Sequence, residues 1–455
     1  RISDTHEHIG LIYWARPKAG TLTLAHAEHH DIRWCSPAEL EARSRAWQVS
    51  IDPATLWPGL DPGALPPAAA AIERSVAAIL SGGRSALGSA RGSDERALGI
   101  AALLSGTGPL LGYWVEAGLL DVSEPVARVL ARHLSHSRRR MQRMTQGVMP
   151  VLSTLVAAGM PPAIIKGFDT AHRYFPEPGA RPLSDVDAVI RADQVARAET
   201  ILAAAGFTGD PIRERPYKRK WHPPGADGRI RSLELWHAEG PWQLDLHDAA
   251  SFGELMRFGI RLDHPLDLSV SWVALGVPLR AAAPPLMITM LAAHLSGELY
   301  IMRLLRLVEL ILVIRQERAQ GRLDWSAVED LLDRTGARRF VYPAFALVER
   351  LAPGTVDPGL LSGTRQASTR LGRQVVAGLT PASPILQERV SLAQRLMFAS
   401  GPAELLRRLL AMVGPVPGSA RTNLQVYHSR LRRVLTARVT WPVSRARSAV
   451  RRPGG

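Results

Sequence analysis

The spacing of apolar and polar positions divides the chain into three parts. In the N-terminal part, apolar residues recur at helical spacing over Pro66–Leu80 and Glu124–Gly159. Between Pro161 and Ser251 the pattern changes to short apolar runs of strand length, separated by turns and a helix. Helical spacing returns over Pro284–Ala319 and Asp324–Ala352. We therefore expect a helix-and-sheet core between two helical regions.

Within this core, the order of the short segments predicts an α+β fold with a small mixed sheet. The expected order is a strand over 162–165, a helical turn over 169–175, a strand over 183–190, a helix over 191–206, and strands over 231–238 and 242–249. The expected domains are a mainly helical N-terminal region over 1–150, the α/β core over 151–280, a helical C-terminal domain over 281–415, and a basic helix and tail over 416–455.

The composition is that of a globular protein with excess positive charge. Of the 455 residues, 46% are hydrophobic and 21% are charged, and the formal net charge is +15. Residues 401–455 contain eleven arginines and one acidic residue, Glu404. This basic segment is open to three interpretations: a solvated tail, a contact to nucleic acid, or a contact to an anionic membrane surface. An anionic partner is thus one expectation, and solubility explains the charge equally well.

Three features bear on the cellular compartment. Cys35 is the only cysteine, so no intramolecular disulfide can form. The first twenty residues lack the apolar stretch of a secretory signal peptide. The most apolar long run, Leu304–Ile314, is too short for a membrane span and carries Arg306 and Glu309. We expect a cytoplasmic protein with no membrane span.

The stretch Arg181–Ile190, RPLSDVDAVI, places two aspartates in an otherwise apolar strand. Because Asp185 and Asp187 are two residues apart, both carboxylates project from the same face. They repel each other unless a cation or a shared proton lies between them, and a divalent cation bound to carboxylates and substrate phosphates removes that repulsion. Asp245, in the later strand segment WQLDLHDA, is the candidate for a third carboxylate.

An Asp-x-Asp pair alone is more often a solvated loop or strand edge, but its surroundings here resemble a known family. The features that carry the resemblance are AIIKG ending at Lys166-Gly167, the helical turn after it, RPLSDVDAVI, a helix ending at Gly206-Phe207, and LDLHDA. Together they resemble the uncharacterised nucleotidyltransferase family of the polymerase-β-like superfamily, over roughly Pro161–Glu349. The resemblance implies a polymerase-β-like nucleotidyltransferase core flanked by helical regions.

The resemblance also implies a role for each motif residue. The implied metal ligands and catalytic residues are Asp185, Asp187 and Asp245, which would hold two Mg²⁺ ions. Asp245 would also help to deprotonate the acceptor hydroxyl. The implied nucleotide-binding residues are Lys166, Gly167, Arg181 and Ser184. Lys166 and Arg181 would neutralise phosphate charge, and Gly167 would let the backbone approach the triphosphate. Ser184 would donate a hydrogen bond to a phosphate oxygen.

Plainer roles remain open for some of these residues. Lys166 could be a surface lysine at a strand end, and Arg181 could pair with Asp185. His247, in LDLHDA, is better explained as a core histidine that donates to a backbone carbonyl than as a metal ligand.

The implied activity is Mg²⁺-dependent transfer of a nucleoside monophosphate from an NTP such as ATP to a hydroxyl. The acceptor stays open among a small molecule, a peptide, RNA and another protein. The alternative is a non-catalytic nucleotide- or partner-binding protein that retains the fold. Two departures from the family pattern bear on activity: Phe168 stands where the superfamily commonly has serine, and Glu309 where relatives tend to have aspartate.

Overall fold

The computed structural model describes most of the chain between residues 64 and 406. The described ranges are 64–87, 95–210, 218–226, 237–248, 262, 265–299, 303–382, 392–399 and 401–406. Cys35, most of the strand expected over 231–238, and the basic segment over 416–455 lie outside these ranges.

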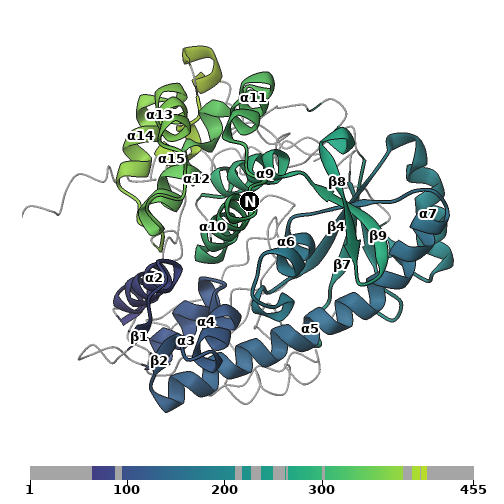
Figure 1. Ribbon diagram of the computed structural model, residues 1–455, viewed down its shortest axis with the longest axis horizontal. Coiled ribbons are helices and arrows are strands. Elements are labelled where there is room, and N and C mark those ends of the chain that lie inside the picture. The colour runs from purple at the N-terminus through teal and green to yellow at the C-terminus, as the bar shows by residue number, and fades with distance from the viewer. Residues whose placement is uncertain are drawn as a thin grey trace, which may run out of the picture.

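A mixed seven-stranded sheet forms the centre of the α/β part (Figure 1). Its strands, in spatial order, are β5 (Thr208–Gly209), β6 (Lys218–His222), β7 (Gln243–Asp248), β4 (Asp185–Ile190), β3 (Ala163–Ile165), β9 (Val277–Ala282) and β8 (Ser269–Ala274). β4 is parallel to β7 and antiparallel to β3, while β3 is parallel to β9. The predicted α+β fold with a mixed sheet is confirmed. The sheet is larger than predicted, because β5, β6 and the hairpin of β8 and β9 were not among the expected strands.

Helices lie on both sides of this sheet and make up most of the rest of the described chain. They are α2 (Leu65–Leu80), α3 (Glu95–Leu104), α4 (Gly108–Glu116), α5 (Glu124–Ala157), α6 (Gly167–Arg173), α7 (Val195–Ala204), α9 (Pro284–Gly297), α10 (Leu304–Ala319), α11 (Trp325–Thr335), α12 (Arg338–Leu351), α13 (Pro358–Ala367), α14 (Arg370–Ala377) and α15 (Leu392–Leu396). Short 3₁₀ turns are η2 (Pro178–Ala180), η3 (Ala192–Gln194) and η4 (Pro265–Leu268). Two short strands, β1 (Ser85–Leu87) and β2 (Leu120–Val122), pair in parallel beside the N-terminal helices.

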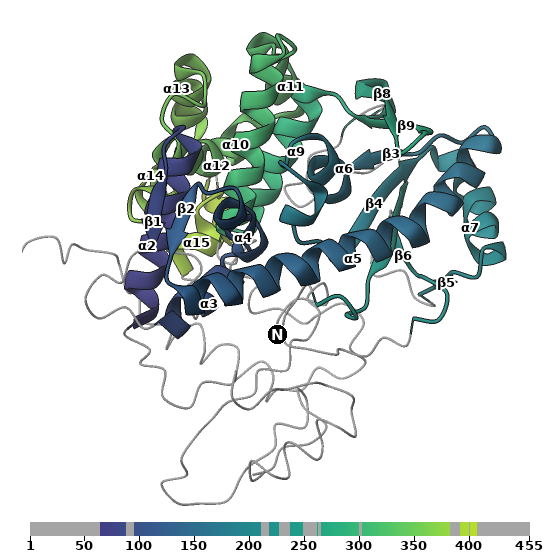
Figure 2. The ribbon, with the colours of Figure 1, turned by 60° about the horizontal axis from the view of Figure 1, so that its bottom comes forward.

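The longest helix, α5, connects the N-terminal helices to the sheet (Figures 1 and 2). Its 34 residues form one continuous helix about 50 Å long, where the sequence left one or two helices open. One end packs on α3 and α4, and the other packs on the sheet and α7. The expected domain boundary at residue 150 therefore falls inside α5, and the division into domains stays a prediction.

The two faces of the sheet belong to different cores. Val186, Ala188 and Leu244 project from one face into a cluster with apolar residues of α5 and α7. Ile165 and Val189 project from the other face into the larger cluster that includes the helical regions. The aspartates of β4 share the second face, so they point toward the helical side of the molecule.

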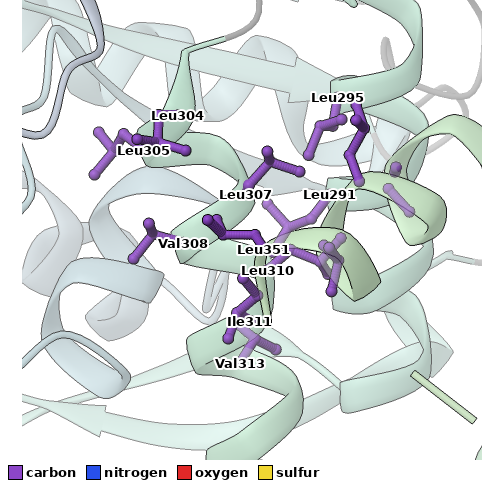
Figure 3. Packing of buried hydrophobic residues seen from close by; sticks show 14 of the residues in the cluster. Leu291, Leu295, Leu304, Leu305, Leu307, Val308, Leu310, Ile311, Val313 and Leu351 are labelled. Carbon is purple, nitrogen blue, oxygen red and sulfur yellow. The ribbon is translucent and has the colours of Figure 1, made fainter. Parts of the chain in front are cut away.

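The larger cluster is centred on α9, α10 and α12. Figure 3 shows leucines of α9 and α10 packing against Leu351 of α12. Residues of α2, α3 and α4 belong to the same cluster, so the N-terminal and C-terminal helical regions share one core. The stretch Asp324–Ala352 forms two helices because Gly336, at φ +66°, ends α11 in the left-handed region.

Within the described residues, no single helix is long and apolar enough to cross a membrane. The helices α3 and α4 reach that length and composition only when taken together, and they meet at a bend of 118°.

Candidate active site

The two strands that carry the predicted aspartates, β4 and β7, are neighbours and run in the same direction. Their register pairs Asp187 with Asp245 and Val189 with His247. Because side chains alternate along a strand, Asp185, Asp187, Asp245 and His247 all project from the same face of the sheet. Parallel pairing thus brings together carboxylates that are distant in the sequence.

The three predicted carboxylates differ in burial. Asp187 is 6% exposed and Asp245 is 0% exposed, whereas Asp185, at the start of β4, is half-buried. One ligand atom from each of Asp187, Asp245 and His247 lies within 4.8 Å of the other two. Asp185 is therefore the most accessible of the three carboxylates.

His247 is a site residue that the sequence interpretation missed. Instead of donating to a backbone carbonyl, its Nε2 lies 2.8 Å from Oδ1 of Asp187. The reason is the parallel register, because His247 lies two residues after Asp245 on the same face of the sheet. The Asp-x-His spacing of β7 matches the Asp-x-Asp spacing of β4, and this was the signal available in the sequence.

Lys166 lies at the edge of the site, between β3 and α6. Its side chain is 9% exposed, and its Nζ lies 3.3 Å from Oδ1 of Asp187. The residue has φ +54°, a backbone conformation that L-residues adopt at an energetic cost and that is often found at functional sites. Burial alone would raise the pKa of Asp187, but the Lys166 ammonium and the His247 hydrogen bond outweigh it and hold this pKa well below its ordinary value.

A second lysine, Lys218 of β6, forms an ion pair with Oδ2 of Asp245. Gln243 donates to the other carboxylate oxygen of Asp245 at 3.0 Å. Burial raises the pKa of Asp245 above its ordinary value, and the Lys218 ammonium opposes that rise. The sequence interpretation did not include Lys218, because only the antiparallel pairing of β6 with β7 places it there.

Arg181 lies beside Glu309 of α10 rather than beside Asp185. Its Nε and Nη2 donate to the two carboxylate oxygens of Glu309 at 2.9 and 3.0 Å. Thr170 and Arg306 also donate to this carboxylate, so Glu309 is held from three directions. Burial lowers the pKa of Arg181, and Glu309 opposes that effect. The predicted contact between Arg181 and nucleotide stays a prediction.

Gly167 and Ser184 border the same site. A Cβ on Gly167 would lie 2.7 Å from Cδ2 of Leu183 and 3.1 Å from Nη1 of Arg181. Close packing against these two residues is therefore one reason for glycine here, apart from any approach to a triphosphate. Ser184 is exposed, and its hydroxyl lies 3.4 Å from Oδ1 of Asp185.

The ligand set fits a divalent cation. Two buried carboxylates and a half-buried one on adjacent strands offer the oxygen atoms that Mg²⁺ and Mn²⁺ prefer. A nitrogen atom of His247 lies within the same group. The lysines that now neutralise two of the carboxylates have flexible stems, so their ammonium groups can move when another cation arrives.

Comparison with known proteins identifies the family. The family model of the uncharacterised nucleotidyltransferases matches residues 98–353, more than half of the chain. The chain belongs to this family, and the resemblance seen in the sequence is confirmed. Membership supports nucleotidyl transfer as the general class of reaction. A search of curated proteins finds no match.

Two solved structures are similar to part of the chain. The solution structure of the antibiotic-resistance factor ANT(2'')-Ia is 12% identical, with a TM-score of 0.24, and the match covers 42% of this chain and 98% of that chain. The crystal structure of an antigenic nucleotidyltransferase-like protein from Paracoccidioides brasiliensis is 15% identical, with a TM-score of 0.27, and the match covers 42% of this chain and 90% of that chain.

Proposed function

We propose that this member of the nucleotidyltransferase family transfers a nucleoside monophosphate from an NTP to a hydroxyl acceptor. In this proposal Asp185, Asp187 and Asp245 hold two Mg²⁺ ions. The observation that carries the proposal is the parallel register of β4 and β7. It sets Asp187 directly beside Asp245, with Asp185 two residues earlier on the same face.

Different residues of the chain have different roles in the proposed reaction. Asp245 accepts the proton of the acceptor hydroxyl, whose oxygen bonds to the α-phosphorus as the bond to pyrophosphate breaks. Lys166 neutralises phosphate charge after leaving Asp187, and exposed Ser184 donates to a phosphate oxygen. The bound ions supply charge stabilisation at the attacking and leaving oxygens.

Binding of ATP, followed by calorimetry with and without Mg²⁺, tests this proposal. Wild type is expected to bind ATP only with Mg²⁺, and the Asp185→Asn/Asp187→Asn double variant is expected to lose that binding. Asp187→Asn alone is expected to abolish transfer. Asp193→Asn removes an exposed carboxylate paired with Arg191 and serves as the control. Equal Mg²⁺-dependent binding by wild type and the double variant would contradict the metal assignment.

The alternative, a non-catalytic protein that binds nucleotide or a partner, draws on a different observation. Lys166 and Lys218 already neutralise Asp187 and Asp245, so these two carboxylates are charge-balanced without a metal ion. This alternative predicts ATP binding that does not depend on Mg²⁺ and no release of pyrophosphate with any acceptor. Measuring pyrophosphate release across small-molecule, peptide, RNA and protein acceptors separates the two functions.

A further inference from the structure

A buried arginine of α5, Arg140, binds the backbone segments that immediately precede the two aspartate-bearing strands, β4 and β7. The residue is only 2% exposed. Nε donates to the carbonyl of Leu183 at 2.5 Å, two residues before Asp185. Nη2 donates to the carbonyl of Pro241 at 2.6 Å, two residues before β7 begins. One guanidinium therefore connects the starts of two strands that are distant in the sequence.

Further hydrogen bonds extend this clamp along the turn before β7. Nη1 of Arg140 donates to the carbonyls of Gly240 and His237 at 2.9 and 3.2 Å. Arg143, one helical turn later, donates to the carbonyls of Ala238 and Gly240 at 2.9 and 3.2 Å. The turn thus offers four carbonyls, those of His237, Ala238, Gly240 and Pro241, to two arginines of one helix.

The chemistry of this contact requires arginine. A guanidinium has five N–H donors in a planar fork, so it can satisfy several buried carbonyls at once. A Cβ on Gly240 would lie 2.9 Å from Nη1 of Arg140, so glycine allows the close approach. A lysine at position 140 would offer one compact ammonium and would leave some of these carbonyls without a donor.

We propose that Arg140 is a positioning residue for the metal site. By fixing the carbonyls of Leu183 and Pro241, it sets how β4 and β7 begin and so holds Asp185, Asp187 and Asp245 in position to share cations. The inference rests on the proposed function, and it assigns no contact between Arg140 and substrate. Small displacements at such supporting residues matter because metal ligands tolerate little error in position.

The test compares Arg140→Lys with Val328→Ala. Val328 is fully buried in α11, so its truncation lowers stability without touching the clamp. Binding of Mn²⁺ in the presence of ATP is measured for both variants and wild type, at a temperature where all three are folded. Arg140→Lys is expected to weaken Mn²⁺ binding about tenfold, and Val328→Ala is expected to leave it unchanged. Arg140→Lys binding Mn²⁺ as tightly as Val328→Ala would overturn the positioning role.

Hydrogen exchange provides a second readout that does not depend on ligand. Arg140→Lys is expected to speed amide exchange in both 183–187 and 241–247, whereas faster exchange in only one segment would overturn the clamp. If Arg140→Lys does not fold, Gly240→Ala displaces the same guanidinium and is expected to give the same two results. Wild type that binds no Mn²⁺ with ATP overturns the proposed function itself, while the exchange result still reports on the clamp.

Discussion

Two groups of buried carboxylates lie on the same side of the sheet, and they are neutralised in different ways. On the sheet, Asp187 is contacted by Lys166 and His247, and Asp245 by Lys218 and Gln243. On α10, the two carboxylates are Glu309 and Glu317, and each accepts hydrogen bonds mainly from arginines. Their donors are Arg181, Arg306 and Thr170 for Glu309, and Arg322, Arg173 and Tyr174 for Glu317.

Neutralisation by arginine suits a structural ion pair, whereas neutralisation by lysine suits a site where one cation can be exchanged for another. An arginine fork holds both oxygens of a carboxylate in fixed geometry, as Arg181 does for Glu309 and Arg322 does for Glu317. A lysine ammonium is a point charge on a flexible stem, so another cation can replace it. We infer that the glutamates attach α10 to the segments around α6, whereas the aspartates keep lone pairs available for metal.

The largest expected effect is on the arginine-bound side. Glu309→Gln leaves Arg181 and Arg306 without their carboxylate, and breaking such a buried pair costs about 3–5 kcal/mol of unfolding free energy. Urea denaturation measures this loss. Glu124→Gln is the control, since it breaks an exposed ion pair with Arg128 and is expected to cost less than about 1 kcal/mol. Equal losses in both variants would remove the distinction between the two groups.

The second-largest effect is expected at Asp169, a buried carboxylate that is only partly neutralised. Asp169 is fully buried and shares Arg173 with Glu317, and burial raises its pKa to about 7. A raised pKa means that the carboxyl of Asp169 binds its proton more tightly in the folded protein than in the unfolded chain. The contribution of Asp169 to the free energy of unfolding therefore falls as the pH rises from about 4 to about 7. The free energy of unfolding of Asp169→Asn should therefore rise by about 3 kcal/mol relative to that of wild type between these two pH values. Denaturation at several pH values measures the gain, and a constant difference would refute it.

In the metal site on the sheet, Asp185→Asn is expected to affect activity and not stability. Asp185 is half-buried and at the strand start, so unfolding free energy should change by less than about 0.5 kcal/mol. Nucleotidyl transfer should fall at least about a hundredfold, equivalent to about 2.7 kcal/mol of activation free energy. Pyrophosphate release and urea denaturation on the same sample check both parts, and a large loss of stability would instead place Asp185 with the structural carboxylates.

The smallest expected effect tests whether lysine can be exchanged for a metal. Lys218→Met removes the ammonium that contacts Asp245, while its apolar stem is retained. Without nucleotide, Mn²⁺ should bind about tenfold more tightly than to wild type, because no side-chain cation competes for this carboxylate. Titration followed by electron paramagnetic resonance measures the affinity. Weaker Mn²⁺ binding by Lys218→Met would show that the lysine supports the site and does not stand in for the metal.

The sequence alone was sufficient for the local features of this protein. Helical spacing predicted α2, α5, α9 and α10, and the strand with Asp185 and Asp187 was predicted almost to its ends. The i, i+2 spacing also placed both carboxylates on one face, because side-chain alternation is a property of the strand itself. The motif order identified the family, which the family model confirms.

Tertiary structure decided which partners these residues have. Lys218 reaches Asp245 only through the pairing of β6 with β7, and Arg181 meets Glu309 only because the fold brings α10 beside the loop before β4. Arg140, in an arginine-rich stretch of α5, is buried against two strand starts. Periodicity is set by neighbours a few residues away, whereas the choice of an ion-pair partner depends on contacts between segments that only the packed core brings together.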